Sequence, residues 1–206
     1  NFLLRLSCMK KLLGIVVLVL IFSLQSWTRA EDITDIEIEG MSIGDSLLDY
    51  YSKSEIDEAL KNPAFYKDEK YVEIFANFKK KSEYDNLQIT IQPDDNKFII
   101  HSIGLIKKFP NKIEECKKEI EKIINANIQI VGNSERIDEN RISGTDPSGN
   151  TFVYLSSFFP AHGGFFNISC HDYGQEVYET RGWVDSLTWS IGSDKFNKFL
   201  RGGDPY

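Results

Sequence analysis

The sequence predicts an α+β fold in which an antiparallel sheet of about six strands, in two three-strand groups, carries its helices on one face. Apolar and polar residues alternate in several segments, as in Leu87–Gln92, which is the period of a strand with one solvated face. Residues 111–127 instead have helical period. Because the connections between strands are short, hairpins and an antiparallel sheet are favoured.

The first half of the mature chain, residues 31–127, opens with an extended lead-in. Leu47, Leu48 and Tyr51 have helical spacing, and Ser52 or Ser54 provides an N-cap for a following helix. The expected elements are the lead-in at 32–40, helices at 42–51 and 55–60, strands at 71–78, 87–92 and 98–106, and a helix at 111–127.

The helix at 111–127 has the clearest pattern. Asn111 is its expected N-cap, and Glu114 stands where the partner of a capping box is found. Its apolar face collects Ile113, Cys116, Ile120, Ile123 and Ile124.

The second half, residues 128–206, is richer in strands. Gly132–Asn150 is polar and rich in turn residues, which indicates a loop. We expect three strands, at 151–158, 165–171 and 183–191, followed by a helix capped by Ser193, and the short apolar run at 128–131 is an optional further strand. Residues 31–206 therefore form one α+β domain by this pattern, with possible sub-halves at 31–127 and 128–206.

Residues 1–30 have the pattern of a secretion signal. Lys10 and Lys11 precede an apolar run of 13 residues, Leu12–Leu24, and small residues lead to a cleavage site after Ala30. Met9 is the expected start. We therefore expect a secreted or periplasmic protein, with an uncleaved N-terminal anchor as the alternative.

The net charge of the mature chain limits the classes of partner that we expect. Residues 1–30 hold four basic and no acidic side chains, so cleavage takes the formal charge from −7 to −11. An acidic protein repels phosphate backbones, so nucleic acid is not an expected partner. We expect no stable membrane insertion of the mature chain, and no motif points to a cofactor.

Two cysteines, Cys116 and Cys170, remain after cleavage. An even pair in an exported chain is typical of a disulfide, with two buried thiols as the alternative. Such a bond would join the helix at 111–127 to a strand of the second half.

Gly44-Asp45-Ser46-Leu47 matches the signature of GDSL esterases and lipases, in which the serine is the nucleophile. That chemistry needs an activating histidine, which the family places in an Asp-x-x-His block. His101, His162 and His171 all lack an aspartate three residues before them. Ser46 is therefore a candidate nucleophile without an evident base, and a residue at a helix start is the alternative.

His171-Asp172 beside Cys170 is the one pattern that suggests a metal ligand pair or a Cys–His nucleophile. Zinc requires three or four clustered ligands, and no CxxC or HxxxH spacing occurs, so we expect no metal site. Aromatic residues such as Tyr173, Trp183 and Trp189 would line a ligand groove or, at strand spacing, fill the core.

The opening of the mature chain, DITDIEIEGMSIGDSLLDYY at 32–51, resembles small secreted proteins of marine alphaproteobacteria, a group without an assigned activity. The similarity continues in ISCHDY at 168–173. It implies secretion and a paired cysteine, and it places GDSL inside a longer unit, EGMSIGDSLLDY, which weakens the esterase interpretation. The predicted topology is also similar to periplasmic helix–helix–three-strand modules of outer-membrane assembly lipoproteins and β-lactamase-inhibitor folds.

Together these patterns predict an exported, non-enzymatic binding or envelope-accessory protein with an unidentified envelope or extracellular partner. The alternatives are a divergent serine hydrolase that uses Ser46 and a cell-surface interaction module built on the aromatic second half.

Overall fold

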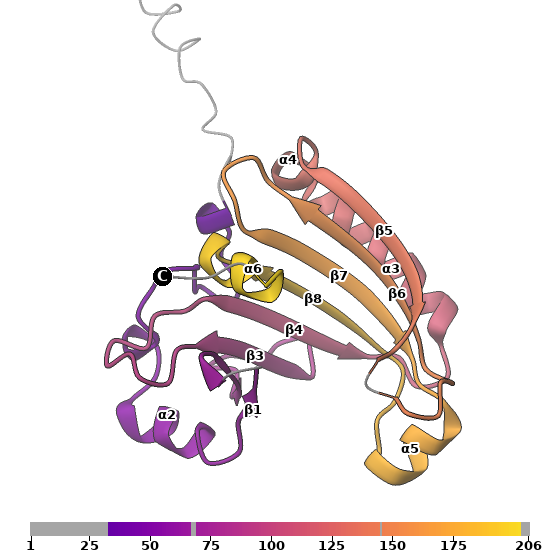
Figure 1. Ribbon diagram of the computed structural model, residues 1–206, viewed down its shortest axis with the longest axis horizontal. Helices are drawn as coiled ribbons and strands as arrows, with labels where there is room; N and C mark the ends of the chain where they lie inside the picture. Colours follow the sequence, from indigo (N-terminus) through magenta and orange to yellow (C-terminus); the bar gives the residue numbers. More distant parts are fainter. Residues whose placement is uncertain (1–32, 67–68, 145, 203–206) are drawn as a thin grey trace, which may run out of the picture.

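The computed structural model describes residues 33–66, 69–144 and 146–202, so the predicted signal, with its start at Met9 and its cleavage site at Ala30, lies outside the described residues. Eight antiparallel strands form one sheet in the order β1-β2-β3-β4-β8-β7-β6-β5 (Figure 1). The strands are β1 (Ala64–Phe65), β2 (Val72–Ala76), β3 (Asn86–Ile91), β4 (Ser102–Lys108), β5 (Glu135–Ile142), β6 (Phe152–Phe159), β7 (Phe165–Asp172) and β8 (Ser186–Gly192).

The sheet consists of two four-strand meanders, β1–β4 and β5–β8. Their last strands, β4 and β8, pair side by side from Ser102↔Gly192 to Lys108↔Ser186. The α+β class and the antiparallel sheet are confirmed, whereas the expected count of about six strands in two groups is wrong.

The two strands that the sequence did not predict both lie at sheet edges. β1 has only two residues. β5 lies in the segment 132–150, expected as a loop, and all eight of its residues are exposed. A strand exposed on both faces has no apolar alternation, which is why periodicity does not detect it.

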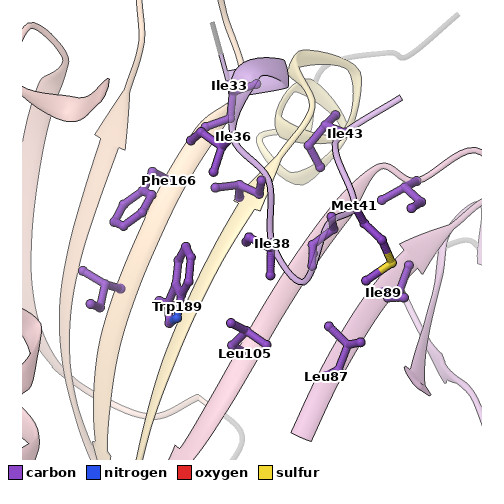
Figure 2. Packing of buried hydrophobic residues seen from close by; sticks show 14 of the residues in the cluster. Ile33, Ile36, Ile38, Met41, Ile43, Leu87, Ile89, Leu105, Phe166 and Trp189 are labelled. Carbon is purple, nitrogen blue, oxygen red and sulfur yellow. The ribbon is translucent and has the colours of Figure 1, made fainter. Parts of the chain in front are cut away.

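One face of the sheet, the apolar face, carries the main core. Leu87, Ile89, Leu105, Phe166 and Trp189 point from it toward the N-terminal segment, as Figure 2 shows. That segment, residues 33–43, crosses the sheet and presents five buried side chains: Ile33, Ile36, Ile38, Met41 and Ile43.

Helix α3 (Ile113–Ala126) also covers the apolar face, with Cys116, Ile120 and Ile124 buried. A disulfide joins Cys116 to Cys170 of β7, with their Cα atoms 6.0 Å apart, and so links the helix to the second meander as predicted. The expected cap is wrong, because Asn111 has φ 56° and Lys112 is the N-cap without a side-chain bond.

Helix α6 (Asp194–Leu200) corrects the expectation that all helices share one face. Phe196 of α6 packs on Phe165 of β7, with ring centroids 6.1 Å apart. Consecutive strand residues point to opposite sides, so Phe165 and Phe166 face opposite ways and α6 lies across the sheet from α3 (Figure 1). Ser193 caps α6 as predicted, by accepting from the Phe196 amide.

The remaining short helices differ in how well the sequence predicted them. Helix α2 (Lys53–Ala59) begins at the expected capping residue, Ser52, which forms a capping box with Glu55. The expected helix at 42–51 is reduced to a 3-10 turn, η2 (Leu47–Asp49), because Ser46 pairs with Ile99 in a β-bridge.

Three helical segments were not predicted: η1 (Ile33–Asp35), α4 (Ile128–Val131), where an optional strand was expected, and α5 (Gln175–Arg181). Within the described ranges, no helix has both the length and the apolar character needed to cross a bilayer.

Candidate functional site

The face of the sheet opposite the main core, the polar face, forms the floor of a groove. Helix α6 closes one end of the groove, and the segment after α5, around Trp183, closes the other. Two adjoining cavities of about 650 and 160 Å³ share Glu73, Gln88 and Thr188, so they form one hollow. A hollow of several hundred Å³ has the size of a small-molecule site.

The floor is a row of side chains in register across four strands. Gln88 of β3 lies opposite Gly104 of β4, Gly104 opposite Ser190 of β8, and Ser190 opposite Asn167 of β7. Amides and hydroxyls thus replace the lysines and glutamates that a freely solvated sheet face would carry.

Gly104 gives the groove its depth. A Cβ at this position would lie 3.3 Å from Gln88 Oε1 and 3.5 Å from Ser190 Cβ. Since both neighbours flank the space above Gly104, any larger side chain would occupy the hollow itself.

Glu73 of β2 borders both cavities. Its carboxylate accepts hydrogen bonds from Gln88 Nε2 at 2.7 Å and from the Tyr66 hydroxyl at 3.2 Å. Burial raises the pKa of Glu73, although both hydrogen bonds act in the opposite direction.

One buried polar atom of the floor has no hydrogen-bond partner among the described residues. Asn167 Oδ1 is buried and accepts no hydrogen bond from any described residue. Buried acceptors are normally satisfied, so such an atom indicates a missing donor.

Aromatic side chains form the walls. Phe75 and Trp183 line the larger cavity and are 50% and 43% exposed. Tyr173 packs edge-on against Trp183, with centroids 5.5 Å apart, and stacks on His171 at 5.6 Å. These contacts fix the Trp183 end of the groove.

His171 is therefore a wall residue. Its Nε2 lies 3.1 Å from Ser169 Oγ. Burial, assisted by the positive charge of Arg141, lowers the pKa of His171 to about 4, so the ring is neutral at pH 7. In the part of the chain that the structure describes, no three His, Cys, Asp or Glu side chains gather as a metal site. Cys170, bound in the disulfide, has no thiolate to serve as ligand or nucleophile.

Ser46, the candidate nucleophile, lies outside the groove. Its hydroxyl donates to the Lys97 carbonyl at 2.7 Å and accepts from the Leu48 amide at 3.3 Å. His101 bonds instead to Ser193, and His171 to Ser169. Ser46 therefore caps η2 and connects it to the segment 97–99.

The aromatic residues singled out from the sequence divide between wall and core. Tyr173 and Trp183 line the groove. Trp189 points to the apolar face and packs on Phe166, with centroids 5.6 Å apart. Tyr178, on α5, is 53% exposed.

The floor residues were not identified from the sequence, although a signal existed. On the polar side of β3, β7 and β8 most residues carry hydroxyls or amides, the others are Phe165, His171 and Gly192, and none is Lys, Arg, Asp or Glu, in a chain that is 27% charged. An uncharged polar face of that extent indicates a covered or ligand-contacting surface.

No known family, no curated protein and no solved structure matches the chain significantly.

Proposed function

We propose that the chain is an exported, non-enzymatic binding protein that holds a small molecule in the groove of its polar face. One observation carries the proposal: a continuous hollow with aromatic walls and a polar floor, in which the buried Asn167 Oδ1 has no partner among the described residues. Ligand sites combine apolar walls with a few convergent polar groups in this way.

Two further observations support export and a binding role. The Cys116–Cys170 disulfide is typical of proteins of oxidising compartments such as the periplasm, which agrees with the signal pattern of residues 9–30. The hydroxyl of Ser46 is engaged with main-chain groups, which favours binding over the alternative of a divergent hydrolase.

The test is a thermal-shift screen of the full mature chain against a panel of sugars, amino acids, amines and organic acids. A ligand of the folded state raises the Tm according to its concentration relative to Kd. We expect at least one compound to raise the Tm of the wild type, and to raise the Tm of Gly104→Val less, because the added side chain narrows the smaller cavity between Gln88 and Ser190. If no compound raises the Tm of the wild type, the groove is not a binding site.

A matched pair of aromatic variants tests the walls. Trp183→Ala removes a wall and should weaken binding at least tenfold, whereas Tyr178→Ala removes an exposed ring outside the lining of the groove. Equal losses in both variants would instead favour the second candidate, an interaction surface built on the exposed aromatics around α5.

A further inference from the structure

Glu73 is a carboxylate without a counter-ion. Its two hydrogen-bond donors, Gln88 and Tyr66, are neutral. No lysine, arginine or histidine forms an ion pair with it among residues 33–66, 69–144 and 146–202. The ion pairs found there involve other carboxylates, such as Glu55 with Lys79 at 2.7 Å.

The amide oxygen of Gln88, which lies beside Glu73, is a second acceptor. Gln88 uses its amide NH₂ on the carboxylate, so its oxygen is the atom that faces the space above Gly104. Asn167 Oδ1, an unpaired acceptor, lies on the same register row as Gln88 but four strands from Glu73, about 19 Å at 4.8 Å per strand, so it belongs to another part of the groove. A ligand that satisfies the Glu73 end of the groove therefore has to supply hydrogen-bond donors.

The nearby wall is aromatic. Phe75 is two residues from Glu73 on the same strand, so both side chains lie on the polar face. Trp183 lines the same cavity. Aromatic rings attract cations through their negative faces, as Arg181 shows by lying 5.0 Å from the Trp183 centroid.

The basic residue that lines the hollow lies at its far end. Ser102 stands at the level of Glu73 through Thr90, and Lys108 follows six residues later on β4, roughly 20 Å along the strand at 3.3 Å per residue. A ligand head group beside Glu73 is thus not neutralised or repelled by this lysine.

We propose that the groove binds an organic cation, with its ammonium group donating hydrogen bonds to Glu73 and its apolar part lying between Phe75 and Trp183. This inference rests on the proposed function and names the ligand class of the same site. A cation offsets the cost of the desolvated carboxylate, whereas an anion would add repulsion to it.

Three probes of similar size test the head group: 2-phenylethylamine, 2-phenylethanol and phenylacetate. They share the phenyl ring and carry a cation, a neutral hydroxyl and an anion. By isothermal titration calorimetry at pH 7.5 we expect the amine to bind at least tenfold more tightly than the alcohol, and the acid most weakly.

Glu73→Gln keeps the shape and removes the charge. It should lower the amine's affinity at least tenfold and leave the affinity for the alcohol within about twofold. The matched control is Glu55→Gln, which neutralises an exposed carboxylate of α2 that pairs with Lys79. It should change neither the affinity for the amine nor that for the alcohol. Thermal unfolding of both variants checks that they fold.

The outcomes separate the two proposals. Equal binding of amine and alcohol, or an unchanged Glu73→Gln variant, overturns the cation inference and leaves the groove as a binding site. If none of the three probes binds but another class in the wider panel does, with loss in Trp183→Ala, the inference is again overturned and the function stands. If nothing in the panel binds, both fail.

Discussion

At the scale of single residues, hydrogen bonding decides the role of Ser46. Its oxygen caps η2 through the Leu48 amide, and its proton is held by the Lys97 carbonyl. The bond to Lys97 joins segments that are 51 residues apart, and the bond from Leu48 caps a helix start. Each bond contributes on the order of 1 kcal/mol.

We therefore expect Ser46→Ala to lower the free energy of unfolding by about 1–2 kcal/mol. Urea unfolding measures this. The same protein should show no change in ester hydrolysis relative to wild type, since we assign Ser46 no catalytic part. A variant of unchanged stability whose esterase activity disappears would restore the hydrolase alternative.

Buried histidines make stability depend on pH. Burial lowers the pKa of both His101 and His171 to about 4, while in the unfolded chain their pKa is near 6.5. Between those values the unfolded chain binds more protons, so the free energy of unfolding falls as pH falls through this window. Around His101, Lys195 adds to the lowering of its pKa and Asp95 opposes it.

From pH 7 to pH 5.5 we expect each of these histidines to remove about 1 kcal/mol of stability. His101→Gln should reduce the difference between urea unfolding curves at the two pH values by that amount. Glu73, whose pKa is raised, acts in the opposite direction, because it gains stability on acidification.

At the scale of elements, the disulfide fixes α3 against the sheet. It closes a loop with a sequence separation of 54 residues, for which the chain-entropy model gives about 4 kcal/mol. We expect Cys116→Ala/Cys170→Ala to unfold at a correspondingly lower urea concentration. Ile120→Val, a conservative change on the same buried helix face, should cost only about 1 kcal/mol.

A chemical measurement complements that variant. Thiol titration of the denatured, unreduced protein should detect neither Cys116 nor Cys170. Detection of both, together with an unchanged unfolding midpoint in the double variant, would show that the two sulfurs are free in solution.

Elements that bury one face could be predicted from the sequence, because burial imposes a period. Leu87, Ile89 and Ile91 of β3 illustrate this, since all three are buried. β5 could not be predicted, because an edge strand with no buried residue has no such period. At 42–51 the helical spacing of Leu47 and Tyr51 was misleading, because pairing with the 98–100 segment overrides local preference.

The groove likewise has residues that the sequence indicates and residues that it does not. The wall residues Tyr173 and Trp183 were identified as candidates because aromatics are conspicuous in a sequence. The floor was not, because it depends on β4 lying beside β8, a contact between residues about 80–90 positions apart such as Ser102 and Gly192. Strand order at that distance leaves no local pattern in the chain.

At the scale of the whole molecule, the β4–β8 pairing makes one sheet of two meanders. The core cluster also runs through both, from Ile74 of β2 to Phe158 of β6. Because neither half has a separate core, we expect a single cooperative transition on urea unfolding.

Far-UV circular dichroism and the fluorescence of Trp183 and Trp189 check this, as the tryptophans report on the second meander and the dichroism reports on both. The two curves should coincide under oxidising conditions. Separate midpoints would mean that the sub-halves 31–127 and 128–206 unfold independently.

Gly104 has a consequence for how such a groove arises and disappears. Every glycine codon is one base away from a codon for valine or alanine, and the backbone at Gly104 is of the ordinary strand type that those residues also accept. Its side-chain direction leads into the hollow and away from the core. A single nucleotide substitution can therefore widen or narrow the smaller cavity of the groove in a lineage while the buried residues that hold the fold remain unchanged.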